Sequence, residues 1–359
     1  MKSYRNLWNE LCLYKNLLLA FERASKGRTK KSCVLEFQKN LKQNILELRT
    51  ELIFHSYRPE PLVTFILHDP KSRKISKSHF RDRIVHHAIC NIIGPFFERE
   101  FIYDSYANRI GKGALKAIQR FDKYQRKVSK NNTRKCFVLK ADIKTYFESV
   151  DISILIQIIE KKIKDKKVIW LIKRVLRNYI GNIFGKGMPL GNLTSQFFAN
   201  VYMNELDQFV KHKLQVKYYL RYVDDFVILH NNKITLDEYK ENIVLFLRDF
   251  LALDLHPTKS KITFLRRGIS FLGFRIFPWH KLLKKSNIKK YTRKLDEYKE
   301  FYKEGIITYD NIYNSFQGWQ GYVSHGDTYK LRTKVRKRIE LYFPNEVATA
   351  EVNRLVRLT

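Results

Sequence analysis

Two adjacent aspartates interrupt a stretch that otherwise has the character of a β-strand. In "RYVDDFVIL" (221–229), Asp224 and Asp225 lie between strand-forming residues, and the preceding "KYYLRY" is equally β-like. Aspartate is disfavoured in strands and common in tight turns, so we expect the pair at the apex of a hairpin. Two carboxylates this close repel each other unless a cation lies between them or a proton neutralises one. The stretch is either an exposed acidic turn or part of a cation site.

A third carboxylate ends another apolar stretch. Asp142 closes "CFVLKAD", which has the pattern of a buried strand. If this strand lies beside the hairpin in one antiparallel sheet, Asp142 and Asp224 can face each other. Carboxylates at strand ends suit Mg²⁺, which keeps waters and binds substrate phosphates. Two such ions activate an attacking hydroxyl and stabilise a leaving pyrophosphate, so the pattern favours metal-dependent phosphoryl transfer.

The charge balance indicates a polyanionic partner. The 359 residues include 69 Lys and Arg against 35 Asp and Glu, for a net charge of +34. An excess of this size points to nucleic acid before a membrane surface. The 21 Tyr and 25 Phe offer flat rings on which bases can stack, although most are expected in the core.

The chain reads as a folded protein of the cytoplasm. Hydrophobic residues make up 44% of the sequence, which argues against disorder. The N-terminal stretch lacks the pattern of a signal peptide, and no apolar run has the length of a membrane span. We therefore expect no membrane association. Neither a disulfide framework nor a zinc site is expected, because the four cysteines are scattered without a CxxC pair: Cys12, Cys33, Cys90 and Cys136.

Helical and strand patterns are interleaved, with a helical segment at each end of the chain. The predicted elements are helices over 1–57, a strand at "LVTFIL", a helix from near Asp82, a helix after Gly113, the strand "CFVLKADI", two helices over 153–180, a helix from about Thr194 to Lys213, the aspartate hairpin, a helix over 237–255, a second strand pair over 261–277, and helices beyond about 287.

Five ordered blocks resemble the palm of reverse transcriptases. They are "ADIKTYFESVD" (141–151), "MPLGNLTSQFFANVYMNELDQFV" (188–210), "YVDD" (222–225), "LDLHPTKSKI" (253–262) and "FLGFRI" (271–276). A tetrapeptide alone is a weak signal, but five blocks in order are strong evidence. The resemblance covers roughly residues 60–280. It implies an α+β right-hand polymerase fold with fingers, an antiparallel palm sheet and a helical thumb. The expected division is an N-terminal helical extension over 1–57, fingers and palm over 58–286, and a basic thumb over 287–359.

The resemblance also implies roles for the acidic residues. Asp142, Asp224 and Asp225 are the expected catalytic carboxylates and, with Ile143, the expected ligands of two Mg²⁺ ions. Phe147, five residues after Asp142, takes the steric-gate position, where a bulky ring rejects a ribose 2′-hydroxyl. The alternative for Phe147 is an ordinary core aromatic.

Several cations match positions that contact phosphates in this family. "KSRKISK" resembles the fingers loop that grips the incoming triphosphate, with Lys71, Arg73 and Lys74 as candidates. Each is equally a solvated loop residue. Lys259 in "PTKSK" matches the palm lysine that can donate a proton to pyrophosphate, and Lys261 is an equally near alternative.

The block "PLGNLTSQ" points to a subfamily. Most reverse transcriptases have glutamine before the glycine and proline after the serine, whereas this chain has Leu190 before Gly191 and Gln196 after Ser195. This departure resembles the reverse transcriptases of diversity-generating retroelements, which copy template adenines with errors. An aliphatic Leu190 beside the nascent base pair removes a polar contact, which favours lower discrimination. The alternative is that Leu190 is a tolerated variant without effect on fidelity.

The resemblance implies RNA-directed DNA synthesis, most specifically mutagenised cDNA made within a diversity-generating retroelement. The implied partners are template RNA, the RNA/cDNA duplex, dNTPs and a small basic accessory protein. A group II intron-like or defence-associated reverse transcriptase is the alternative with the same chemistry. A non-catalytic RNA-binding scaffold is the alternative from another class, and the presence of all three aspartates argues against it.

Overall fold

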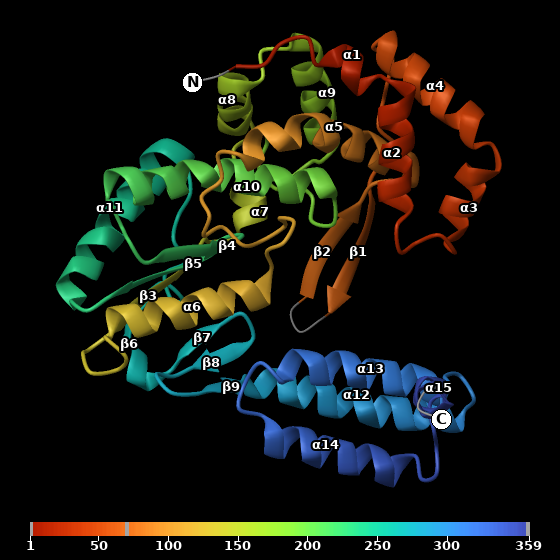
Figure 1. Cartoon of the computed structure of the whole chain (residues 1–359). Coiled ribbons are helices and arrows are strands. Elements are labelled where there is room, and N and C mark those ends of the chain that lie inside the picture. The colour runs from red at the N-terminus through yellow and green to blue at the C-terminus, as the bar shows by residue number, and fades with distance from the viewer. Residues whose placement is uncertain (1–2, 69–71, 357–359) are drawn as a thin grey trace. The chain divides into compact units, whose positions relative to one another are not determined.

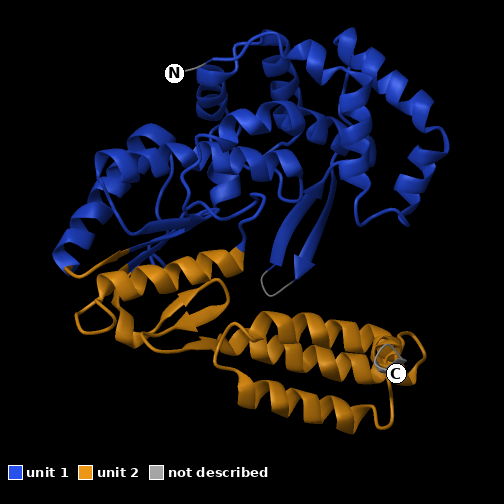
Figure 2. Cartoon of the chain, viewed as in Figure 1, with its two compact units in different colours: residues 1–113, 139–228, 233–261 blue, residues 114–138, 229–232, 262–359 orange. Residues whose placement is uncertain are grey.

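The chain forms a mixed α/β structure that separates into two compact units (Figures 1 and 2). The computed structural model describes residues 3–68 and 72–356. Unit 1 comprises residues 1–113, 139–228 and 233–261, and unit 2 comprises residues 114–138, 229–232 and 262–359. Because the chain passes between the units several times, neither unit is a single continuous stretch of sequence.

Helices make up most of unit 1. They are α1 (Trp8–Leu11), α2 (Tyr14–Ser25), α3 (Ser32–Lys39), α4 (Leu41–Ile53), α5 (Phe80–Glu98), α7 (Tyr146–Ser149), α8 (Ile152–Lys162), α9 (Lys166–Arg177), α10 (Leu193–Gln208), the π-helical turn η1 (Phe209–Lys213) and α11 (Lys233–Leu251). α5 packs against α2 and α10, and α8 packs against α9 and α10. Burial at Ile84, Val85, Ala88 and Ile89 follows helical spacing and gives α5 a continuous apolar face.

The aspartate hairpin consists of β4 (Tyr219–Tyr222) and β5 (Asp225–His230), which pair antiparallel. β3 (Phe137–Asp142) is the other neighbour of β5 in a four-stranded sheet of order β4-β5-β3-β6. The prediction that the strand ending in Asp142 lies beside the hairpin is therefore confirmed. The prediction of the apex is half right, because the turn consists of Val223 and Asp224, while Asp225 pairs with Tyr222 as the first residue of β5.

The predicted second strand pair over 261–277 is confirmed in part, because the range contains three strands that belong to two sheets. β6 (Lys261–Phe264) joins the sheet of β3, whereas β7 (Ile269–Phe271) and β8 (Phe274–Ile276) pair with each other and β9 (Lys281–Leu283) pairs with β8. A 3₁₀ turn over Leu265–Arg267 separates the two sets of strands. Gly268, with φ of +78°, lets the chain turn there at little conformational cost. A separate hairpin of β1 (Val63–His68) and β2 (Ser72–Lys77) belongs to unit 1.

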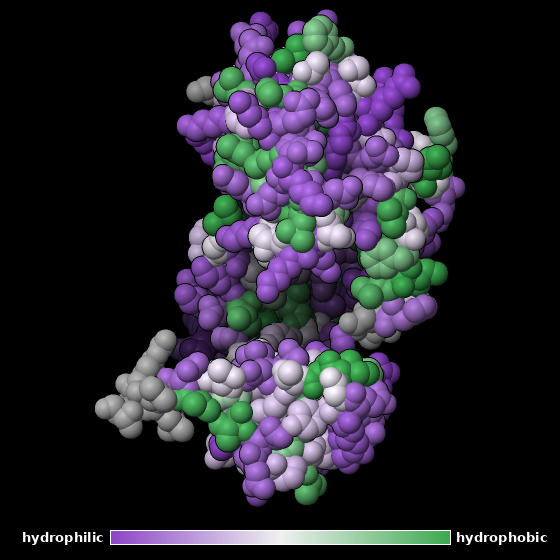
Figure 3. Space-filling view, turned by 90° about the vertical axis from the view of Figure 1, so that its right-hand side faces the viewer, coloured by the Kyte–Doolittle hydropathy of each residue, from purple (hydrophilic) through white to green (hydrophobic). Residues whose placement is uncertain are grey.

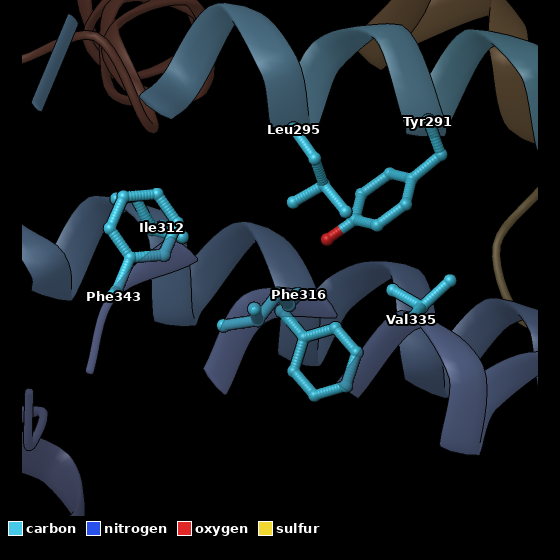
Figure 4. Close-up of a cluster of buried hydrophobic side chains, with 7 residues drawn as sticks. Tyr291, Leu295, Ile312, Phe316, Val335 and Phe343 are labelled. Carbon is cyan, nitrogen blue, oxygen red and sulfur yellow. The ribbon is translucent and has the colours of Figure 1, made fainter. Parts of the chain in front are cut away.

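Unit 2 contains α6 (Ala114–Val128) and the predicted C-terminal helices. These are α12 (Lys285–Lys303), α13 (Tyr309–Val323), α14 (Tyr329–Tyr342) and α15 (Thr349–Val356). Figure 4 shows side chains of α12, α13 and α14 directed toward one another in an apolar cluster. The pairs Tyr291/Leu295, Ile312/Phe316 and Val335/Ile339 each stand one helical turn apart, so each helix contributes one stripe to the cluster.

Hydrophilic residues cover most of the face shown in Figure 3, with hydrophobic residues in small groups between them. Such a surface agrees with the charge of the chain. No helix within residues 3–68 and 72–356 is long and apolar enough to cross a membrane.

One fully buried ion pair lies behind the aspartate hairpin. Asp207 of α10 and Arg221 of β4 form two parallel bonds, Nε to Oδ1 at 2.8 Å and Nη2 to Oδ2 at 2.6 Å, and neither side chain is exposed. Burial alone would lower the pKa of Arg221, but the Asp207 carboxylate raises it above its usual value, so the guanidinium stays charged. The hydroxyl of Tyr219 donates to Asp207 Oδ1 at 2.6 Å, and together these bonds satisfy the buried carboxylate.

We predict that Asp207→Asn destabilises the protein by about 3–5 kcal/mol, because it leaves the Arg221 charge buried without its counter-charge. Urea unfolding followed by circular dichroism measures this loss. The control is Lys161→Gln, which breaks a surface ion pair with Glu205 and should cost at most about 1 kcal/mol. A loss for Asp207→Asn no larger than that of the control would contradict the assigned importance of the buried pair.

Candidate active site

The turn between β4 and β5 is held in an unusual backbone conformation. Val223 has φ of +59°, a region that a β-branched residue rarely adopts. Nη1 of Arg221 donates a hydrogen bond to the carbonyl oxygen of Val223 at 2.7 Å. This bond ties the turn, and with it Asp224, to the buried ion pair with Asp207.

Asp142 and Asp224 lie together at the end of β3 and in the turn. Burial, followed by the charge of Asp142, raises the pKa of Asp224 to about 7. The negative charge of Asp225 and a hydrogen bond between the Asp142 and Asp224 carboxyl groups act in the same direction. Asp224 therefore retains a proton to a higher pH than an isolated carboxyl group does.

Two lysines contact carboxylates of the aspartate group, which consists of Asp142, Asp224 and Asp225. Nζ of Lys259 lies 2.5 Å from Oδ2 of Asp142, and Nζ of Lys140 lies 3.3 Å from Oδ1 of Asp225. Of the two lysines that the sequence left open, Lys259 makes the contact with Asp142, while Lys261 begins β6 and is exposed. Lys140 was missed by the sequence analysis. Side-chain alternation along β3, which places Lys140 and Asp142 on one face, was the signal that could have found it.

The aspartates suit a divalent cation by their chemistry. Within the described ranges, no three Asp, Glu, His or Cys side chains converge closely enough to form a metal cluster. Two partly buried carboxyl groups, one of which has a raised pKa, are nevertheless an environment that a hard cation stabilises. Ile143, the remaining predicted ligand, is buried and forms a β-bridge with Leu255.

Residues 188–192, called the Leu190 segment below, are hydrogen-bonded to β2 and the residue that follows it. The carbonyl oxygen of Leu190 accepts a hydrogen bond from the amide of Ser76 at 3.0 Å. Oδ1 of Asn192 accepts from the amide and the hydroxyl of Ser78, at 2.9 and 3.0 Å, and Nδ2 of Asn192 donates to the carbonyl of Ser76 at 3.1 Å. Asn192 was missed because an asparagine before a helix reads as an N-cap, whereas its side chain bonds to another part of the chain.

Gly191 allows the close approach between this segment and β2. Its φ is +111°, and a Cβ atom there would lie 3.0 Å from Cγ2 of Ile75. Both the conformation and the space favour glycine. Alternation along β2 places Arg73 on the face of Ile75 and Lys74 on the opposite face, so at most one of them shares the side of Gly191. Lys71 lies outside the described residues.

Phe147 is half-buried in α7 and is linked to the same segment. The amide of Met188 donates to the carbonyl oxygen of Phe147 at 2.7 Å, and the Phe147 ring lies 5.4 Å from the ring of Tyr146. Gln196 is exposed in the first turn of α10. The predicted site residues thus form two groups, the aspartates with Lys259 and the Leu190 segment with Phe147 and β2. Gln196 is exposed, and Lys74 lies on the face of β2 opposite Ile75.

The raised pKa of Asp224 predicts a pH-dependent stability of the metal-free protein. Because the folded state favours the protonated carboxyl, this contribution is present at low pH and is lost as the pH rises through about 7. We expect the melting temperature in EDTA to fall by a few degrees between pH 6 and pH 8 by this contribution. Mg²⁺ should offset the fall by compensating the ionised pair.

Asp224→Asn is the matched control, because its amide cannot ionise and has nearly the same shape. Thermal melts of both proteins at each pH, with EDTA or Mg²⁺, isolate the contribution of Asp224 from those of other titrating groups. Identical pH profiles for the two proteins in EDTA would show that Asp224 does not titrate in this range.

Curated relatives share about two thirds of the chain at low identity. Protein YkfC of Escherichia coli is 28% identical over 272 residues, covering 64% of this chain and 70% of that protein. The group II intron-encoded protein LtrA of Lactococcus lactis is 25% identical over 294 residues, covering 62% of this chain and 47% of LtrA. A putative COX1/OXI3 intron 2 protein of Saccharomyces cerevisiae is 21% identical and is covered over 31% of its length. The chain thus spans less than half of the last two.

Among solved structures, apo telomerase from Candida tropicalis aligns with a TM-score of 0.47 and 12% identity, over 62% of this chain and 48% of that one. The sequence profile of the family "Reverse transcriptase (RNA-dependent DNA polymerase)" matches residues 68–276, more than half of the chain. That range contains the aspartate group, Lys259, Phe147 and the Leu190 segment. The chain belongs to the reverse transcriptase family, the RNA-dependent DNA polymerases, and has homology to the enzymes encoded by group II introns.

Proposed function

We propose that this protein copies template RNA into cDNA at the aspartate group. The observation that carries the proposal is the partly buried Asp142–Asp224 pair, in which the pKa of Asp224 is raised and Asp142 contacts the Lys259 ammonium group. Mg²⁺ bound there would activate the primer 3′-hydroxyl and stabilise charge on the phosphates. Asp142, Asp224 and Asp225, with Ile143 beside them, are the residues that we propose to hold two such ions.

The remaining residues of the site have proposed roles in positioning and proton transfer. Lys259, whose ammonium group lies 2.5 Å from Asp142, would be in position to donate a proton to the departing pyrophosphate. Arg73, on the face of β2 that approaches Gly191, neutralises charge on the incoming triphosphate. Phe147 excludes the ribose 2′-hydroxyl and so selects dNTPs. In this proposal residues 58–286 are the fingers and palm, residues 287–359 are the thumb, and residues 1–57 are an N-terminal extension.

The Leu190 segment supports the finer proposal that the enzyme belongs to a diversity-generating retroelement. Leu190 is half-buried, and its carbonyl oxygen is bonded to β2, so its side chain has an aliphatic surface where most of the family has an amide. Such a surface cannot hydrogen-bond an incoming nucleotide. The product would be cDNA mutagenised at template adenines, made with a small basic accessory protein. A group II intron-like enzyme of ordinary fidelity is the alternative, and it has the same aspartate chemistry.

Asp142→Asn and Asp224→Asn each should abolish Mg²⁺-dependent dNTP incorporation on an RNA template while leaving RNA affinity nearly unchanged. Each substitution removes a ligand charge that the metal requires but leaves the basic surface intact. Primer extension and filter binding measure the two properties. Asp254→Asn, the same change at an exposed aspartate, is the control and should stay active. Substantial synthesis by both site variants would refute the metal assignment.

Leu190→Gln should lower misincorporation opposite template adenine more than opposite the other bases. One restored hydrogen bond is worth roughly 1 kcal/mol, which is several-fold in selectivity. Sequencing of cDNA made by both enzymes on one template measures the change. Leu193→Gln, a half-buried leucine three residues further on, controls for a general effect of glutamine in this segment. An unchanged adenine error rate in Leu190→Gln would favour the group II intron-like alternative.

A further inference from the structure

A cluster of lysines and arginines on α8 and α9 stands apart from the aspartate group. Residues 152–177 contain eight Lys and Arg but only two acidic residues. In Figure 1, α8 and α9 lie on the side of α5 and α10 that faces away from strands β3, β4 and β5. The packing of α8 on α10 and of α9 on α5 agrees with this arrangement. The cluster is therefore a surface separate from the proposed site of synthesis.

Five of these eight cations form no ion pair with the described residues. Lys161, Lys162 and Lys173 pair with glutamates. Asp165 is occupied as the cap of α9, because it accepts hydrogen bonds from the amides of Lys167 and Val168. Across the described residues, no ion pair is formed by the other five cations, which are Lys164, Lys166, Lys167, Arg174 and Arg177. Their mutual repulsion remains uncompensated, which favours a polyanion as the ligand.

Four of these five cations line a groove instead of a convex face. The α8–α9 groove, of about 650 Å³, is bordered by Lys164, Lys166, Arg174 and Arg177. Lys173 also lines it, but Lys173 is paired with Glu160, the only acidic residue of the lining. Cations whose only role is to keep the protein soluble would be expected to spread over the surface and not to line one groove. The geometry instead resembles a channel for a chain of negative charges.

The same groove has an aromatic wall. Trp170 lines it, with its ring half-buried against Trp8 at 6.1 Å and His55 at 4.9 Å between ring centres. These contacts fix the indole while part of it remains accessible. Basic grooves with aromatic faces bind single-stranded nucleic acid, because the cations follow the backbone and the rings stack on bases. An acidic protein segment would use the cations but would have less use for the ring.

The groove continues into a second hollow toward the Leu190 segment. Lys173 and Arg177 line both, and the second hollow, of about 630 Å³, also contains Lys186 and the fully exposed Phe184. Its one acidic residue, Asp151, caps α8 through the amides of Ser153 and Ile154.

The far wall of the second hollow leads to Phe147. Gly187 belongs to that wall, and the next residue, Met188, donates its amide to the carbonyl of Phe147. The two hollows thus connect the outer face of α9 with the segment beside the proposed site of synthesis. The direction of this path suits a strand that leaves or approaches that site.

We propose that the α8–α9 groove and the adjoining hollow bind single-stranded RNA outside the primer–template duplex. The strand's phosphates contact Lys166, Arg174 and Arg177, and bases stack on Trp170 and Phe184. The inference rests on the proposed function in one respect, namely that the nucleic acid bound by the protein is RNA. It adds a second binding surface, which secures template RNA without taking part in the chemistry.

The test compares two RNA ligands that share one primer–template duplex. One has a template overhang of a few uridines, and the other has a long oligouridine overhang. The variant is Lys166→Gln/Arg174→Gln/Arg177→Gln, and the matched control is Lys26→Gln/Lys30→Gln/Lys31→Gln, which removes three exposed charges from the α2–α3 loop. Fluorescence anisotropy over a salt series gives the affinities, and thermal melts verify that both variants are folded.

We expect the wild-type protein to bind the RNA with the long overhang more tightly than the RNA with the short one. The groove variant should bind the long-overhang RNA at least about tenfold more weakly than the wild type does. The salt slope should fall by about 2, at about 0.7 for each single-strand phosphate contact. Synthesis on the short overhang should be unchanged in the groove variant, and the control should keep the affinity for the long overhang.

Three results would overturn the inference. These are equal affinities of wild type for the two overhangs, an unchanged slope in the groove variant, or an equal loss in the α2–α3 control. Binding of polyglutamate in the groove without any overhang effect would indicate an acidic protein ligand instead. If the wild-type protein failed to synthesise cDNA but kept the overhang effect, the proposed function would fail while the groove assignment would stand.

Discussion

The buried bond between Arg221 and Asp207 is the constraint on which the aspartate hairpin depends. All five N–H donors of Arg221 are used, toward Asp207, Asn200, Ser105 and the carbonyl of Val223. Only the bond to the Val223 carbonyl reaches the turn. The other four bonds hold the Arg221 guanidinium in the position from which it makes that bond. A left-handed valine costs of order 1–3 kcal/mol, and such strain persists only where the surroundings determine the conformation fully. The buried Arg221–Asp207 pair fixes this conformation of the turn, and the turn thereby positions Asp224.

The aspartate group is an acidic site in a strongly basic protein, and the contrast has a physical consequence. Lys140 and Lys259 each contact one carboxylate, and burial together with the charge of Asp142 raises the pKa of Asp224. The metal-free protein thereby avoids an uncompensated cluster of negative charge, which would be costly at this depth. These interactions can be exchanged for a divalent cation because Lys259 is partly exposed and can move into solvent. The arrangement explains how the Asp142 and Asp224 carboxyl groups can lie side by side and still remain available to a cation.

The sequence predicts the local elements better than it predicts their partners. Helical and strand periodicity located α5, α6, α8 to α11 and the aspartate hairpin, since those patterns depend on residues near one another. The division of residues 261–277 between two sheets was not predicted, because "KITF" and "ISF" are equally good strands and the 3₁₀ turn between them separates the two sheets. Asn192 and Lys140 were missed for the same reason. Their partners lie more than eighty positions away, so a local pattern can place a side chain on one face of a strand but does not identify the residue that it contacts.

The position of Leu190 links fold to function through β2. Three hydrogen bonds from Ser78 and Asn192, together with the bond from Ser76 to Leu190, connect the segment to the end of β2. Gly191 permits this contact because any Cβ would press on Ile75. A movement of the β1–β2 hairpin would therefore carry Leu190 with it, and through the bond from Met188 it would also act on Phe147. The residues proposed to judge the base and the sugar of an incoming nucleotide are thus mechanically coupled, so a change at Leu190 can alter base discrimination without reaching the aspartates.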